Sequence, residues 1–167
     1  HIMQNNYFQF EGQIYHQIQG TAMGTPVAPS VANLFMGLLE QKILKNSPIT
    51  VQAELWKRFI DDIFLLWLGS RGDLDAFLAY INTVHSSIKF TSSTSTSELP
   101  FLDIRIKLQD GLLQTDLYTK PTDAHNFLHY SSAHPLHCKN NIPYSQFLRI
   151  RRLCSSEEDF MTRIHEM

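Results

Sequence analysis

Two adjacent acidic residues, Asp61 and Asp62, lie in the middle of Glu54–Leu68, a segment otherwise rich in aromatic and branched apolar residues. A buried carboxylate without a partner costs several kcal/mol, so something must compensate the pair. A divalent cation is suited to this, because carboxylates that share one cleft are the ligands of two-metal phosphoryl-transfer sites. The alternative is a solvated Asp-Asp turn. We favour a metal site because large apolar residues flank the pair on both sides.

A β-hairpin between two helices would position this pair. We interpret Glu54–Leu68 as two buried strands joined at the acidic residues. Apolar residues at helical spacing predict a helix over Pro29–Lys45 and a second over Asp73–His85, which Asp73 could cap. The aromatic residues of the hairpin are expected in the core rather than in a base-stacking platform. They are Trp56, Phe59, Phe64 and Trp67.

Period-two alternation predicts further strands along the chain. They are expected at Tyr7–Phe10, Gln13–Ile18, Ile88–Thr91, Phe101–Leu108 and Leu112–Tyr118. The first two should form a hairpin whose apolar side chains face a core, namely Phe8, Phe10, Ile14 and Ile18. Asp110-Gly111 is a strong signal for a hairpin turn between the last two strands.

The C-terminal part combines predicted helices with a local basic stretch. Pro143 is expected to open one helix, and Ser155 with Glu158 has the capping-box spacing for the last one. Lys139–Leu153 contains basic residues and no acid. Basic residues on one helix face can contact nucleic-acid phosphates, although a solvated helix face is the alternative. The candidates are Lys139, Arg149, Arg151 and Arg152.

A histidine-rich connector precedes this helix. It contains His125, His129, His134, His137 and Cys138, which could offer tetrahedral zinc ligands. Their spacing matches no compact zinc module, so we favour hydrogen bonding or nucleic-acid contacts over zinc.

Composition narrows the class of protein. The chain has 167 residues, of which 43% are hydrophobic and 18% charged, as in a globular protein with one sizeable core. A net charge of −2 gives no overall field that attracts a polyanion, so basic residues must act locally. No apolar run reaches the roughly 18 residues of a membrane span. Only two cysteines are present, which fits a reducing, intracellular compartment.

Several motifs resemble those of one enzyme family. Phe59-Ile60-Asp61-Asp62 resembles the aromatic-x-Asp-Asp box of reverse transcriptases, and Gln19–Pro26 is similar to their template and nucleotide-pocket motif. The closer resemblance is to reverse transcriptases of Penelope-like retroelements. It is carried, in order, by Leu99–Asp103, Leu117–Asp123, His134–Gln146 and Arg149–Cys154.

The resemblance implies specific roles for these residues. Asp61 would be the main ligand of a catalytic Mg²⁺ or Mn²⁺ ion, and Asp62 its weaker partner. The nucleotide and template pocket would be formed by Gln19, Gly20, Met23, Gly24, Thr25 and Pro26. Glycines in that loop let the main chain approach a base pair closely. Tyr118, Thr119 and Lys120 fall where such enzymes grip the primer end.

The resemblance also implies a missing part. Two metals need about three carboxylates, and in this family the third stands on a strand upstream of the Gln19–Pro26 motif. The sequence starts one hairpin before that motif, so we expect weak or absent catalysis by this chain alone. Asp103 and Asp116 are not expected to substitute, because strand acids opposite an apolar face usually face water. Removal of the strand predicts an exposed sheet edge, and hence a homodimer or an N-terminal partner.

We therefore expect an α+β fold with a palm-like antiparallel sheet packed by helices, followed by a small helical thumb base. Residues 1–120 would form a partial reverse transcriptase palm, and residues 121–167 a connector and the start of the thumb. The expected parent activity is RNA-directed DNA polymerisation on an RNA template and a DNA primer with deoxynucleotides, in an intracellular, nuclear setting without a membrane. The alternative is a non-catalytic RNA-binding or self-association module derived from a retroelement.

Overall fold

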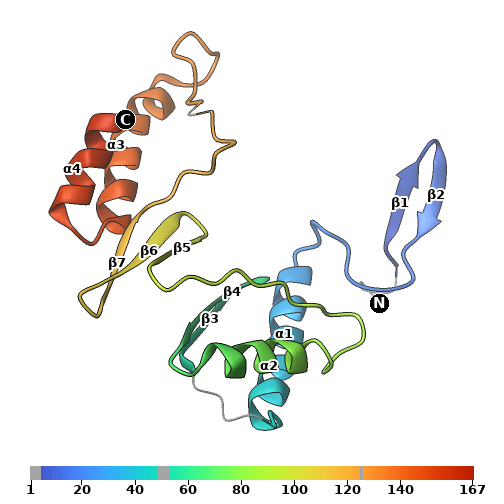
Figure 1. Cartoon of the computed structure of the whole chain (residues 1–167). Helices are drawn as coiled ribbons and strands as arrows, with labels where there is room; N and C mark the ends of the chain where they lie inside the picture. Colours follow the sequence, from blue (N-terminus) through green and yellow to red (C-terminus); the bar gives the residue numbers. More distant parts are fainter. Residues whose placement is uncertain (1–4, 49–52, 125) are drawn as a thin grey trace. The chain divides into compact units, whose positions relative to one another are not determined.

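The computed structural model of the chain describes residues 5–48, 53–124 and 126–167. They form a mixed α+β protein with small antiparallel sheets and four helices (Figure 1). The predicted α+β class is therefore confirmed. The chain divides into two compact units, an N-terminal unit (His1–Thr91) and a C-terminal unit (Ser92–Met167). The boundary expected after residue 120 separates functional roles rather than compact units, and it stays a prediction.

The N-terminal unit is built on one β-hairpin and two helices. Strands β3 (Ala53–Phe59) and β4 (Asp62–Trp67) pair as predicted, and helices α1 (Ala28–Lys45) and α2 (Arg71–Ile81) pack on them. The core residues come from both helices and from one face of the hairpin. They are Leu39, Ile43, Phe77 and Ile81, against which Trp56, Leu65 and Trp67 pack. The periodicity of the sequence thus located both helices and the hairpin.

Helix α2 begins and ends differently from the prediction. Ser70, not Asp73, is its N-cap: the Ser70 hydroxyl accepts a hydrogen bond from the Asp73 backbone N–H at 3.1 Å and donates one to the Asp73 carboxylate at 2.7 Å. The helix stops at Ile81 because the chain then turns back. The predicted strand Ile88–Thr91 is wrong. The Asn82 side chain accepts a hydrogen bond from the Phe90 N–H at 2.7 Å and donates one to the Phe90 carbonyl at 3.0 Å, so these backbone groups do not pair with another strand.

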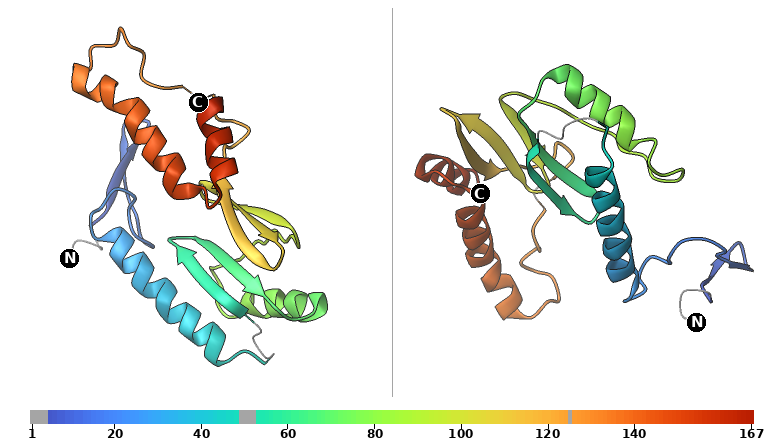
Figure 2. Two further views of the ribbon diagram at one scale, coloured as in Figure 1. Left: turned by 90° about the vertical axis from the view of Figure 1, so that its left-hand side faces the viewer. Right: turned by 90° about the horizontal axis from the view of Figure 1, so that it is seen from below.

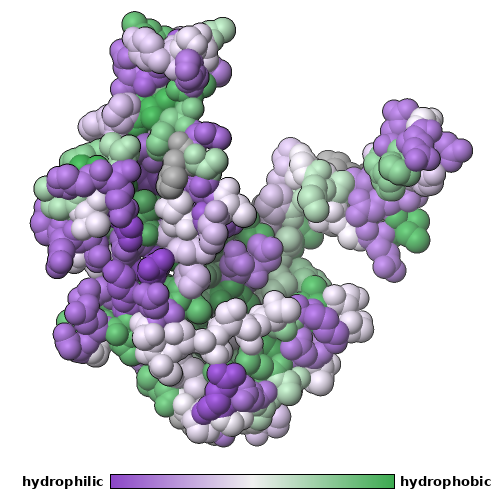
Figure 3. Space-filling model, turned by 45° about the horizontal axis from the view of Figure 1, so that its top comes forward, coloured by the Kyte–Doolittle hydropathy of each residue, from purple (hydrophilic) through white to green (hydrophobic). Residues whose placement is uncertain are grey.

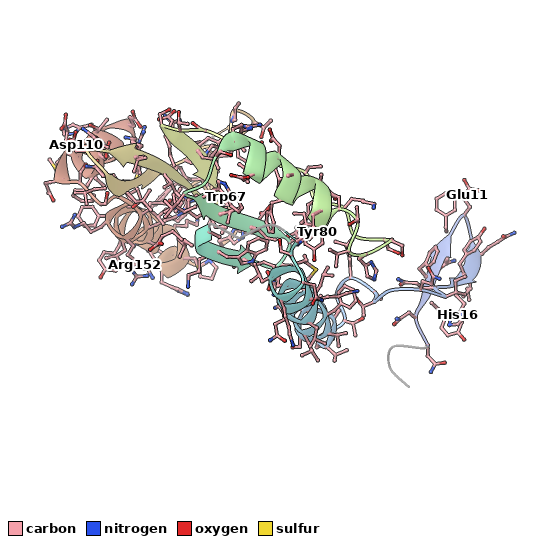
Figure 4. The ribbon with its side chains drawn as sticks, turned by 60° about the horizontal axis from the view of Figure 1, so that its bottom comes forward. Glu11, His16, Trp67, Tyr80, Asp110 and Arg152 are labelled. Atoms are coloured by element: carbon pink, nitrogen blue, oxygen red, sulfur yellow. The ribbon has the colours of Figure 1, made fainter. Side chains whose placement is uncertain are left out.

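Strands β1 (Tyr7–Phe10) and β2 (Gln13–His16) form the predicted N-terminal hairpin. Its tip, Glu11-Gly12, has positive φ angles of 49° and 78°, as a tight hairpin turn requires (Figure 4). The expectation that its apolar side chains face a core is wrong. Phe8, Phe10, Ile14 and Ile18 are all exposed, Ile18 at 86%, and Figure 3 shows hydrophobic residues on the hairpin surface. Phe8 stacks across the strands on Tyr15 instead, with ring centroids 5.4 Å apart.

The sheet of the C-terminal unit contains β5 (Glu98–Phe101), β6 (Ile104–Gln109) and β7 (Leu112–Leu117) in that order, all antiparallel. The turn at Asp110-Gly111 is confirmed, with φ angles of 53° and 76°. The single strand predicted over Phe101–Leu108 is wrong. Leu102, at a φ of 53°, reverses the chain together with Asp103, so Asp103 lies in a turn and β6 starts after it.

Two helices complete the C-terminal unit, α3 (Leu136–Leu153) and α4 (Glu157–Glu166), joined by a short turn (Figure 2). Pro143 lies inside α3 and does not open it. Pro135 is the N-cap residue instead. Ser156, not Ser155, caps α4 by accepting a hydrogen bond from the Asp159 N–H at 3.0 Å. Ser155 bonds the backbone of Thr115 on β7 at 2.8 Å and so joins the turn to the sheet.

A buried carboxylate links the sheet to α4. Asp116 on β7 is 0% exposed, so the expectation that this strand acid faces water is wrong. Arg163 holds it with two hydrogen bonds, at 2.9 and 2.5 Å, and the Lys107 ammonium lies 3.5 Å away. Burial alone raises the pKa of Asp116, but hydrogen bonds and charge from Arg163, and then the charge of Lys107, outweigh it, so the pKa is lowered. Asp116 is therefore a charged group inside the unit.

Beside this carboxylate lies a small apolar core. Ile150 and Cys154 at the end of α3 and Phe160 on α4 are buried, and Leu117 and Ile164 pack against them. Burial raises the pKa of the Cys154 thiol. The sheet, α3 and α4 thus share one apolar and ionic core.

Candidate functional site

The acidic pair lies at the tip of the β3–β4 hairpin. Phe59 pairs with Asp62, which leaves Ile60 and Asp61 as a two-residue turn with a φ of 54° at Ile60. Asp61 and Asp62 are both exposed. The argument that burial forces a compensating charge on the pair is therefore wrong. Two neighbouring carboxylates in solvent nevertheless remain accessible to a cation.

Arg58 fixes this turn on helix α1. Its guanidinium donates hydrogen bonds to the Ile60 carbonyl at 2.9 Å, to the Asn33 side-chain oxygen at 2.8 Å and to the Glu40 carboxylate at 2.8 Å. The Trp56 indole donates to the same Glu40 oxygen at 2.9 Å. The Arg58 and Glu40 side chains are largely buried, and this network holds the turn against α1.

This network was not predicted from the sequence. Its signal was present, since Arg58 directly precedes the aromatic-x-Asp-Asp box inside an apolar strand, where a charged group needs partners. The partners lie 18 and 25 residues earlier in the chain, and spacing alone could not identify them.

The acidic residues lie outside the helix-covered core. Side chains alternate along β4, so Asp62 shares a face with Phe64 and Leu66, opposite the face of Leu65 and Trp67 that packs on the helices. Trp67 is labelled in Figure 4, next to α2. The expectation that all four hairpin aromatics are core residues is correct for Trp56 and Trp67, which pack against the helix-covered core, whereas Phe64 is buried on the opposite face. The expectation is wrong for Phe59, which is exposed.

The predicted nucleotide-pocket loop runs directly into α1. Gly20 and Gly24 adopt φ angles of 80° and 86°, which favour glycine, and Met23 is fully exposed. The Thr25 carbonyl accepts a hydrogen bond from the N–H of Ala28, the first residue of α1. Gln19 and Pro26 are exposed. Helix α1 therefore connects the two motifs, since the loop enters its first turn and Asn33 receives the bond from Arg58.

The predicted primer-grip residues belong to the C-terminal unit. Tyr118 follows β7, and its N–H donates to the Asp103 carbonyl at 2.9 Å. The Arg105 guanidinium lies over the Tyr118 ring, 6.0 Å from its centroid. Thr119 is half-buried and Lys120 exposed. Tyr118 is thus fixed by its neighbours, whereas Lys120 extends into solvent.

Three of the four predicted phosphate-binding cations have partners within the C-terminal unit. Lys139 donates to the carbonyls of Tyr130 and Ser132, each at 2.6 Å. Arg149 pairs with Asp103 at 2.9 Å, and Arg151 pairs with Glu157 at 3.3 Å and lies over the Phe160 ring. Arg152, labelled in Figure 4, is exposed and makes no hydrogen bond or ion pair with any described residue.

The described residues contain no preassembled metal cluster. Within residues 5–48, 53–124 and 126–167, no group of three His, Cys, Asp or Glu side chains is arranged to hold an ion. His129 and His134 contact the hydroxyls of Ser131 and Ser132, at 2.7 and 3.2 Å, which is the hydrogen-bonding role favoured above. His125 lies outside the described residues. Among the helices described, none is long and apolar enough to cross a membrane.

The comparisons with known proteins concern the C-terminal end. A family model for the animal helix-turn-helix domain matches residues 126–167, which contain α3 and α4. No curated protein and no solved structure matches the chain. The chain is thus similar to this family over its last two helices.

Proposed function

We propose that this chain is the palm and thumb-base part of an RNA-directed DNA polymerase related to the reverse transcriptases of Penelope-like retroelements. The observation that carries the proposal is the exposed Asp61-Asp62 pair on a hairpin turn that Arg58 ties to α1. The order of the family's motifs along the chain supports the same function.

Asp61 and Asp62 would hold a Mg²⁺ or Mn²⁺ ion, since hard cations prefer carboxylate oxygens. When bound, the ion supplies Lewis-acid chemistry for the attack of a primer 3′-oxygen on the α-phosphate of a deoxynucleotide. Arg58 would keep the turn in one orientation through the Ile60 carbonyl. Gly20 and Gly24 would let the backbone approach the nascent base pair.

The catalytic power of this chain alone is expected to be low. A two-metal site takes about three carboxylates. Asp116 cannot supply the third, because it is buried and held by Arg163 in the C-terminal unit. Asp103 is also engaged, by Arg149.

The C-terminal unit would hold the RNA–DNA duplex. Two observations support nucleic-acid binding: the match of its last two helices to the helix-turn-helix family, and the exposed Arg152 at the end of α3, which pairs with no residue that the structure describes. Phosphate contacts of this kind bring affinity without sequence selectivity, as a polymerase requires.

The second candidate is a non-catalytic module that binds RNA or associates with itself. One observation favours self-association, namely the exposed apolar side chains of the β1–β2 hairpin. Exposed apolar surface of this kind is a common feature of protein interaction sites.

Primer extension on an RNA template with Mg²⁺ or Mn²⁺ tests the polymerase. We expect slow, template-dependent extension that Asp61→Asn lowers by more than about 100-fold, the scale of removing one group that stabilises transition-state charge. The matched control is Asp110→Asn, which removes an equivalent charge from the exposed β6–β7 turn and should leave extension unchanged. Extension that survives Asp61→Asn would contradict the proposal. Primer–template binding without any extension would favour the non-catalytic module.

A further inference from the structure

In the helix-turn-helix match, the second helix, α4, begins with an acidic turn, which is unfavourable for contact with nucleic acid. In helix-turn-helix proteins the second helix places its N-terminal residues against base edges in the major groove. Here the first turn of α4 contains Glu157, Glu158 and Asp159. Glu157 and Glu158 are exposed at this end and would lie against the phosphates of the groove and repel them, although Glu157 also pairs with Arg151. Asp159 is half-buried and held by Lys107 at 3.0 Å.

The remaining surface of α4 offers little compensation. Its only arginine, Arg163, is held by the buried Asp116 and by Glu166 at 2.7 Å. Phe160 and Ile164 pack into the core. The His165 ring contacts the Met161 carbonyl at 2.7 Å. Helix α4 therefore presents no cation that is free to contact a phosphate.

Helix α3 has the opposite character. Its 18 residues include no acid. Asn141, Ser145, Arg149 and Arg152 follow one another at spacings of three or four, so they lie on one face of the helix, and all four are exposed. The buried Ile150 lies on the other side. We call these four residues the polar face of α3. The amide, hydroxyl and guanidinium groups of these side chains can all donate hydrogen bonds to phosphate oxygens.

We propose that the helix-turn-helix binds duplex nucleic acid through the polar face of α3, and that α4 packs against the opposite side of α3 and stabilises it. This inference rests on the proposed nucleic-acid function and deepens it. Arg152 donates directly to phosphate, since no described residue competes for it. Arg149 exchanges the Asp103 carboxylate for phosphate. That ion pair is exposed on both sides, so little stability is lost when it opens.

Asp103 therefore acts as an internal competitor for the phosphate. It lies in the β5–β6 turn, and its carboxylate is 2.9 Å from Arg149. A phosphate must displace it before Arg149 contributes to binding. The affinity for a duplex is then set partly by a turn that lies outside the matched helices.

Site-specific photo-crosslinking tests which helix meets the duplex. The full chain is used in a Cys138→Ser background, where the remaining Cys154 is buried, and a thiol-linked photo-crosslinker is attached at Ser145→Cys or at Thr162→Cys. Both positions are exposed, the first on α3 and the second on α4. We expect an RNA–DNA duplex to crosslink at position 145 and not at 162. Crosslinking at 162 in place of 145 would overturn the inference and leave the nucleic-acid function intact, whereas no binding of the duplex at low salt would count against that function itself.

The salt dependence of binding tests the two arginines. Each phosphate contact contributes about 0.9 to the slope of log affinity against log salt concentration. We expect Arg152→Gln to lower the slope by about that amount. Asp103→Asn should raise affinity at low salt more than Asp110→Asn does, although both remove one exposed charge from a turn of the same sheet. Equal effects of the two Asp variants would overturn the proposed exchange at Arg149.

Discussion

Arg163→Met is expected to destabilise the C-terminal unit by about 3–5 kcal/mol, because it leaves Asp116 buried without its main partner. Asp116 is fully buried, and Arg163 supplies both of its closest contacts. Lys107 is 3.5 Å away and also serves Asp159 at 3.0 Å, so it cannot replace two guanidinium hydrogen bonds. Methionine keeps the apolar stem of arginine and lacks its guanidinium, so the loss mainly reports the hydrogen bonds and the charge given to Asp116.

Hydrogen exchange of the β7 and α4 amides measures this loss. Both tryptophans of the chain, Trp56 and Trp67, lie in the N-terminal unit, so their fluorescence serves as an internal control and should not change. The matched variant is Arg151→Gln, which breaks an exposed ion pair and should cost less than about 1 kcal/mol. An Arg163→Met effect as small as that of Arg151→Gln would contradict the role of the buried pair.

The same variant has a defined pH dependence. The folded pKa of Asp116 is lowered from its ordinary value of 3.8, so its contribution to stability is present above pH 3.8 and is lost as the pH falls through the lower folded pKa. Without Arg163, burial raises the pKa of Asp116 and favours its neutral form. The difference between the wild type and Arg163→Met should therefore shrink below about pH 4.

Phe77→Ala is expected to destabilise the N-terminal unit by about 3–5 kcal/mol. Phe77 is 0% exposed, stacks on Trp67 at a centroid distance of 5.4 Å and meets the edge of Trp56 at 6.3 Å. Its removal leaves a cavity between α2 and the hairpin that the two large indoles cannot fill without moving.

Denaturant unfolding followed by tryptophan fluorescence measures this effect, because both indoles touch the substituted position. The control is Phe59→Ala on the same hairpin. Phe59 is 56% exposed, so its truncation should cost far less. Similar losses for the two variants would show that Phe77 is not the centre of this core.

The sequence predicted the elements whose signal is local. The β3–β4 hairpin and helix α1 follow from apolar periodicity, and the Asp110-Gly111 turn from its residue types. Features that depend on distant partners were missed. From its position Asp116 was predicted to be a strand acid that faces solvent, and Arg163, 47 residues later, together with Lys107, makes its burial possible. The apolar alternation of the β1–β2 hairpin likewise predicted a strand pair correctly but not its exposure.

The candidate site likewise combines a feature that the sequence predicted with features that depend on distant residues. Adjacent acids between apolar runs located the tip of the hairpin from sequence alone. The argument from burial failed, because Asp61 lies in a two-residue turn, Asp62 directly follows it at the start of β4, and both are exposed. The bracing of the turn by Arg58, Asn33 and Glu40 requires α1 to lie against β3, which no local pattern encodes.

We propose that Asp61 and Asp62 form a divalent-cation site, and Mn²⁺ titration followed by paramagnetic broadening of backbone amide signals tests this most directly. The chain provides its own comparison, since the first turn of α4 holds three acids with no proposed metal role. We predict that the amides of residues 60–63 broaden at the lowest Mn²⁺ concentration and that Asp61→Asn removes this effect. Broadening that begins at Glu157–Asp159, or that persists at the hairpin tip in Asp61→Asn, would contradict the claim.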